Sequence, residues 1–140
     1  MLALSISDVK GFMTKLLKGE TFDNFVLKNV FINSFVRFEI YGISDGECVK
    51  WNAVRPHVLS IIKGDEPPKS IKIVLGKEAE EAGLRDVALS FNIHFEDGKV
   101  SITTGISKKN FSLDKSDDEK WDAAVLNFLD DSNIKYVSGL

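Results

Sequence analysis

The 140-residue sequence contains little cysteine and no long apolar run. Cys48 is its only cysteine, which excludes an intramolecular disulfide and fits a reducing compartment. The first residues show no basic region followed by an apolar one, and no apolar run approaches the roughly 18 residues of a membrane span. We therefore expect a soluble, cytoplasmic protein with no membrane partner.

The patterns of common catalytic and cofactor sites are also missing. The sequence has no glycine-rich phosphate loop, no nucleophile elbow and no Ser-His-Asp order. His57 and His94, the two histidines, lie in different predicted elements and have no fixed spacing to a cysteine or carboxylate. The sequence therefore assigns no catalytic residue, no metal ligand and no cofactor.

What the sequence does contain is the composition of an ordinary globular protein. Hydrophobic residues make up 44% and charged residues 28%, and the net charge is −3. The length is typical of one domain, so we expect a single domain over residues 1–140 with one hydrophobic core. The net charge excludes a polycation but leaves room for a local basic surface.

Three segments have the apolar spacing i, i+3, i+4 and i+7 of amphipathic helices, over residues 9–17, 51–62 and 116–129. Ser7 or Asp8 can cap the first helix. Each apolar stripe is wide enough to face a core, so the stripes predict three helices packed on one sheet.

Two of the helix starts need a specific cap. With Asn52 as the cap of the second helix, Pro56 falls in the first turn, where the missing N–H has no helical partner to lose. Ser116, with Glu119 three residues later, is typical of a capping box at the start of the third helix. Both helices are therefore predicted to begin at polar caps.

Alternating apolar residues predict a mainly antiparallel sheet. The turn pair Asp97-Gly98 is typical of a two-residue type I′ hairpin, which sets Glu96 opposite Lys99. Residues 42–47 are expected to form a polar loop. Strands are predicted over residues 2–6, in two runs within 25–41 that reverse at Asn33-Ser34, and over 71–75, 87–95, 100–104, 111–113 and 134–137. The predicted fold class is α+β, with three amphipathic helices on this sheet.

The charges are unevenly distributed along the chain. Residues 1–70 carry nine basic and eight acidic side chains, whereas residues 71–140 carry nine and thirteen. If the first two helices lie side by side, their basic residues form one face that could contact nucleic acid or a protein partner. The candidate residues are Lys10, Lys15, Lys18, Arg55 and Lys63.

The acidic third helix has two interpretations. Asp118 and Asp122 are four residues apart, so they share one helix face and could hold a divalent ion. The simpler interpretation is a solvated face whose carboxylates interact with the helix dipole.

Function is open between three classes at this point, and one of them is a purely structural partner subunit, which an exposed apolar patch or a bare strand edge would mark. We expect a non-catalytic binding module that uses the basic faces of the first two helices. The alternative is a small enzyme or ligand-binding domain with a pocket between sheet and helices, using His57 or His94.

Short motifs are spread over almost the whole chain: Ser7-Asp8-Val9-Lys10, Phe12-Met13, Leu16-Leu17, Glu20-Thr21-Phe22-Asp23, Arg55-Pro56, Ile62-Lys63-Gly64, Trp121-Asp122 and Phe128-Leu129. In these motifs the chain resembles an uncharacterised family of small bacterial proteins. The resemblance implies no activity, because that family has none established.

The order of predicted elements resembles one domain of a sliding DNA clamp. Strand, helix, strand, strand over residues 2–43 is followed by helix, strand, strand, strand over residues 51–113. In clamps the two helices carry basic residues and line the DNA channel, so the resemblance implies a clamp-like module. The clamp pattern has no counterpart of the acidic third helix. The resemblance rests on the order of elements alone, which is weak evidence for function.

Overall fold

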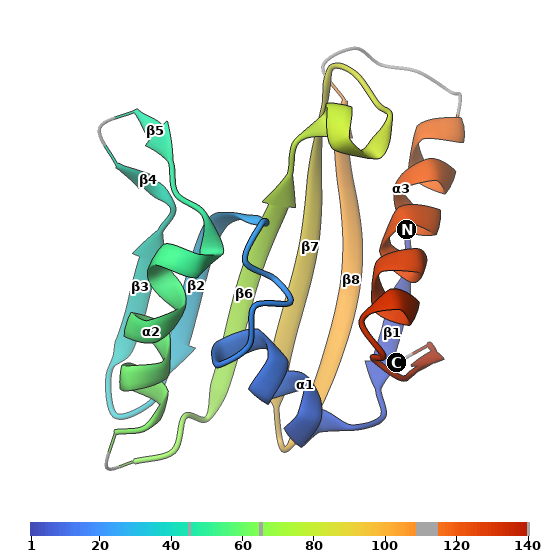
Figure 1. Ribbon diagram of the computed structural model, residues 1–140. Helices are drawn as coiled ribbons and strands as arrows, with labels where there is room; N and C mark the ends of the chain where they lie inside the picture. The colour runs from blue at the N-terminus through green and yellow to red at the C-terminus, as the bar shows by residue number, and fades with distance from the viewer. Residues whose placement is uncertain (45, 65, 109–114, 140) are drawn as a thin grey trace.

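A seven-stranded antiparallel sheet with helices on one face forms the body of the protein (Figure 1). The computed structural model describes residues 1–44, 46–64, 66–108 and 115–139. Within these ranges, no helix combines the length and apolar character needed to cross a bilayer. The expected α+β class is confirmed.

In chain order the elements are β1 (Ala3–Ile6), α1 (Val9–Leu17), β2 (Val26–Asn33), β3 (Arg37–Tyr41), β4 (Ile43–Ser44), β5 (Glu47–Cys48), α2 (Trp51–Ile62), β6 (Ser70–Lys77), η1 (Ala79–Ala82), β7 (Val87–Glu96), β8 (Lys99–Lys108), α3 (Ser116–Asp131) and β9 (Tyr136–Ser138).

Neighbouring strands of the main sheet are antiparallel, in the order β3-β2-β6-β7-β8-β1-β9. The turn of the β7–β8 hairpin has φ of 53° at Asp97 and 72° at Gly98, the left-handed values of the predicted type I′ turn. Glu96 pairs with Lys99 across this hairpin, as predicted. The free edges of the sheet are β3 and β9.

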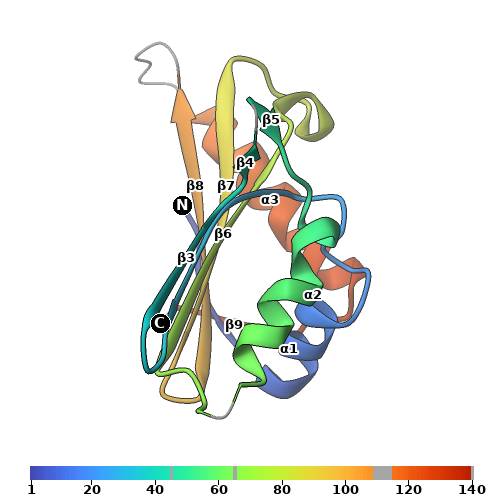
Figure 2. The same ribbon diagram turned by 90° about the vertical axis from the view of Figure 1, so that its left-hand side faces the viewer.

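Side chains of the sheet alternate between a face covered by α1, α2 and α3 and an open face (Figure 2). The covered face is apolar and joins the helix side chains in one hydrophobic cluster. The open face carries polar side chains such as Asn92, whose Nδ2 donates to Thr103 Oγ1 at 3.2 Å. The largest fully buried side chains of the cluster are Trp51, Phe12, Phe22 and Phe91, with Leu4, Leu16, Leu27, Ile32, Ile73, Leu75, Leu89 and Ile93.

Helices α1 and α2 are in contact within the helix layer. The buried Trp51 indole donates a hydrogen bond from Nε1 to the Leu16 carbonyl oxygen at 2.8 Å. The Trp51 amide donates to the Phe25 carbonyl oxygen at 2.9 Å, which ties the start of α2 to the chain entering β2. One residue therefore sets the position of α2 against both α1 and the sheet.

The starts of α1 and α2 agree only partly with the predictions. Asp8 caps α1, because its Oδ1 accepts a hydrogen bond from the Gly11 amide at 3.0 Å. The predicted Asn52 cap is wrong, since α2 begins at Trp51 and Pro56 lies inside the helix. Asn52 and Pro56 are both exposed, so the carbonyl that lacks a helical donor is on the solvent side of the helix.

The start of α3 also differs from its prediction. Lys115 is the N-cap, and its carbonyl accepts from the Glu119 amide at 3.1 Å, without a side-chain cap. Ser116 is already helical, so the predicted capping box is wrong. Asp117 and Asp118 lie in the first turn, at the positive end of the helix dipole. The strand predicted over residues 111–113 lies outside the described residues.

The chain leaves the edge of the main sheet at Gly42. Its amide donates to the Lys28 carbonyl at 3.0 Å, and its own carbonyl accepts from the Val49 amide at 2.9 Å. A Cβ atom at this position would overlap the backbone carbonyl of Leu27, so only glycine permits the approach. The polar loop predicted over residues 42–47 is wrong in part, because Ile43–Ser44 and Glu47–Cys48 pair as the short strands β4 and β5.

Trp51→Phe is expected to lower the free energy of unfolding by about 2 kcal/mol, since the Leu16 carbonyl loses this donor and a cavity opens beside it. Urea denaturation measures the change. Tyr41→Phe, at an exposed aromatic residue, serves as the control and should change stability by less than about 0.5 kcal/mol. Equal losses in the two variants would contradict the role of the indole.

Candidate nucleic-acid interface

The surface formed by α1 and α2 is basic and free of acidic residues within the helices. Neither Val9–Leu17 nor Trp51–Ile62 contains an aspartate or glutamate. Lys10 in α1 and the C-cap residues Lys18 and Lys63 are exposed. The two helices are adjacent, and both cover the same face of the sheet (Figure 2).

Arg55 is held by a carboxylate of its own chain. Its Nε and Nη2 donate to Asp23 Oδ1 and Oδ2 at 2.9 and 3.1 Å, a bidentate pair whose side chains are only about one fifth exposed. The hydrogen bond to Asp23 raises the pKa of Arg55 above its ordinary value. This pair attaches α2 to the segment that follows α1, so the guanidinium is already engaged.

Lys15 is engaged in a similar way at the other side of α1. Its Nζ donates to the carbonyl oxygens of Ser132 and Asn133 at 2.6 and 3.2 Å. Ser132 is the C-cap of α3, where carbonyl groups lack helical donors and the dipole is negative. Lys15 therefore neutralises the end of α3 and joins α1 to it.

The five predicted site residues thus divide into two groups. Lys15 and Arg55 bind partners within the chain, whereas Lys10, Lys18 and Lys63 are exposed and make no ion pair with any residue that the structure describes. The partners of Lys15 and Arg55 are distant along the chain, so no local sequence pattern predicts these contacts.

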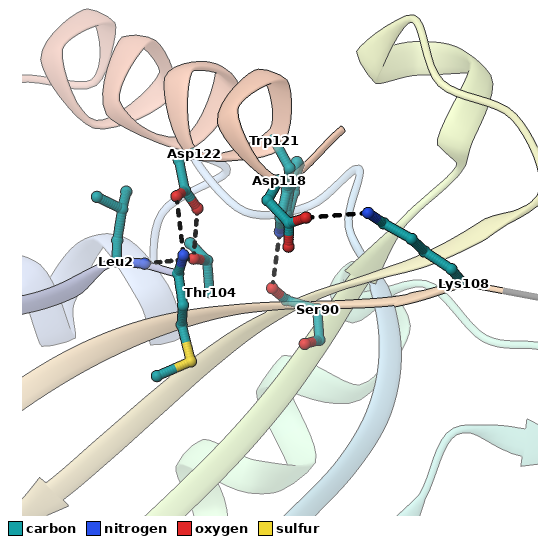
Figure 3. Close-up of polar contacts among 8 residues, drawn as sticks. Leu2, Ser90, Thr104, Lys108, Asp118, Trp121 and Asp122 are labelled. Atoms are coloured by element: carbon teal, nitrogen blue, oxygen red, sulfur yellow. Dashed lines mark hydrogen bonds and ion pairs between the residues drawn. The ribbon is translucent and has the colours of Figure 1, made fainter. Parts of the chain in front are cut away.

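The acidic pair of α3 faces the sheet (Figure 3). Asp118 Oδ2 lies 3.1 Å from Lys108 Nζ on β8. Asp122 Oδ1 accepts a hydrogen bond from the buried Thr104 hydroxyl at 2.7 Å, and its Oδ2 lies 3.1 Å from the Met1 ammonium nitrogen. Both carboxylates attach α3 to the sheet, so neither the solvated face nor the divalent-ion site is supported. Among the described residues, no three metal-ligating side chains converge.

The two histidines lie on opposite faces of the molecule. His57 is exposed on α2, and His94 is on the open sheet face with Nε2 3.5 Å from Glu96 Oε2. A surface cavity of about 200 Å³ includes His94 together with Ser5 and Lys99. It lies on the open face, not between sheet and helices, where the alternative function placed its pocket.

Arg55→Lys keeps the charge but removes the bidentate geometry, so it is expected to lower the free energy of unfolding by about 1 kcal/mol. Urea denaturation of the variant measures this loss. Arg85→Lys, at an exposed arginine, is the matched control and should leave stability unchanged. An Arg55→Lys variant as stable as the control would show that the Asp23 pair does not hold α2.

Comparison with known proteins identifies a family but no activity. No curated protein and no solved structure has significant similarity to the chain. A family model does match residues 15–137, which confirms the resemblance to an uncharacterised family. The chain belongs to DUF5721, a family of unknown function.

Proposed function

We propose that this protein is a non-catalytic binding module that contacts the phosphates of nucleic acid through the α1–α2 surface. This surface consists of Lys10, Lys18 and Lys63 with Lys50, the exposed N-cap residue of α2. The observation that carries the proposal is the pairing of two adjacent helices without an acidic residue, in a chain of net charge −3. Such a local excess of positive charge attracts a polyanion.

The contacts around the lysines support this role because they join the helices to one another and to the sheet. The Trp51 indole and the Arg55–Asp23 pair hold α2, and Lys15 holds α1 against α3. The four exposed ammonium groups are therefore carried on helices of defined spacing. Lysine is a point charge without base-specific geometry, so the proposed binding is independent of sequence.

Two further parts of the proposal concern the architecture of the module and its location in the cell. The element order β1-α1-β2-β3 and α2-β6-β7-β8, with both helices on one face, supports a clamp-like module. We also propose a cytoplasmic location, which the free Cys48 supports because a reducing compartment keeps a lone thiol reduced.

Fluorescence anisotropy of labelled duplex DNA tests the proposal. Four phosphate contacts would make the logarithm of the binding constant fall with the logarithm of salt concentration with a slope of about −3.6. The double variant Lys10→Glu/Lys63→Glu should weaken binding at least about tenfold at low salt and reduce that slope by about two.

The control has the same change in net charge on other surfaces. Lys72 lies on the open sheet face and Lys120 on α3, and both are exposed. Lys72→Glu/Lys120→Glu should weaken binding less than about threefold. Equal weakening by the two double variants would show attraction by net charge alone, and no binding at low salt would refute the proposal.

A further inference from the structure

Four of the six large apolar side chains that are exposed in the described part of the chain gather at one edge of the main sheet. Phe35 is 71% exposed, Tyr41 62%, Ile43 69% and Val36 48%. All four lie in β3 or directly beside it, where the strand forms the outermost element of the sheet (Figure 1). Exposed apolar residues in one place mark a surface that binds another protein.

The backbone of β3 is open to another strand. Gly42 donates its amide proton to Lys28 of β2, so by the alternation of an antiparallel ladder the N–H and C=O groups of Arg37, Glu39 and Tyr41 point away from the sheet. The strand Arg37–Tyr41 contains no proline, lysine or bulge of the kind that blocks pairing at an edge.

We propose that a second copy of this chain pairs with this edge, β3 against β3, around a two-fold axis at Phe38. In this register the outward backbone groups of Arg37 face those of Glu39 in the second copy, so a hydrogen-bonded ladder can form. Arg37 and Glu39 project from the same face, and each meets the opposite charge across the axis. Because of the two-fold symmetry, the contact between Arg37 and Glu39 of the other copy occurs twice.

The apolar residues also fit this register. It places Phe35 opposite Tyr41 and Val36 opposite Ile40 of the second copy. Phe38 meets its own counterpart at a narrow, non-hydrogen-bonded pair, where side chains approach most closely. The exposed apolar surface of the edge is therefore covered by the same surface of the second copy, as an isologous interface requires.

Arg37 and Glu39 also pair within one strand, Nε to Oε1 at 2.9 Å, so the registers differ only in the charges that meet across the axis. An axis at Glu39 sets this carboxylate opposite itself, which is unfavourable. An axis at Ile40 sets Arg37 opposite Ile43 and gives the guanidinium no carboxylate of the second copy. The spacing of Arg37 and Glu39 matches a copy of the same strand, which is the reason to assign this edge to self-association and not to an unrelated peptide.

Charge reversal tests the interface in the intact chain. Sedimentation velocity over a wide concentration range should show a monomer–dimer equilibrium. Arg37→Glu and Glu39→Arg should each weaken the dimer at least about tenfold, because each sets like charges opposite one another twice. The double variant Arg37→Glu/Glu39→Arg should restore the dimer to within about threefold of the original, since the charges are matched again.

Arg85→Glu is the matched control for charge, and it should leave the dimer unchanged. Arg37 and Glu39 are about half exposed, so thermal melting should show that every variant stays folded. A chain that is monomeric at all concentrations would overturn the proposal. Assemblies larger than a dimer, or a double variant no better than the single ones, would overturn the two-fold register.

A cysteine at the axis provides an independent measurement. In a Cys48→Ser background, Phe38→Cys should form a disulfide-linked dimer under mild oxidation, because residues facing each other at this pair are within disulfide distance. Val137→Cys, on the opposite edge strand β9, is the control and should remain monomeric. Cross-linking through Val137 and not Phe38 would place the interface at the other edge.

Discussion

The hydrogen bond from the Trp51 indole to the Leu16 carbonyl holds α2 against α1, and the arrangement of the basic residues depends on it. A buried indole N–H requires an acceptor, and here the acceptor belongs to the neighbouring helix. The bond therefore sets a distance between two elements as well as satisfying a donor. Lysines that are far apart along the chain come to lie on adjacent helices over one face of the sheet because these two helices cannot separate.

Charged side chains elsewhere in the molecule join its layers. Asp118 forms an ion pair with Lys108 of β8, Asp122 accepts a hydrogen bond from Thr104 of the same strand, and Lys15 donates to the end of α3. Each of these groups is partly shielded from water, which strengthens its contact relative to one on an exposed surface. The acidic helix is thereby attached to the fold, and its negative C-terminal end is covered by a lysine of the basic half.

Local patterns were sufficient to predict much of this fold. Asp97-Gly98 defines its hairpin because the turn geometry is encoded in two residues, and the apolar stripes define the three helices. The sequence did not reveal which charged residues are free. Arg55 and Asp23 are 32 residues apart, and Lys15 and Ser132 are 117 apart, so only the folded chain brings them together.

Errors at the helix starts have a related origin. Asn52 and Ser116 are good capping residues, yet the N-cap of α2 lies two residues before Asn52 and that of α3 one residue before Ser116. For α2, the burial of Trp51 and its bond to Leu16 favour including this residue in the helix. Tertiary packing therefore outweighs a cap preference of about 1 kcal/mol.

The contact at Gly42 has a consequence for how the family has diverged. The peptide of Leu27 occupies the space that any side chain at this position would need, so a substitution there could survive only if the backbone of two strands moved together. Exposed residues outside the two proposed binding surfaces are free to vary among relatives, but position 42 should be glycine throughout the family. It would serve as a fixed reference point for aligning members too distant to be matched by their cores.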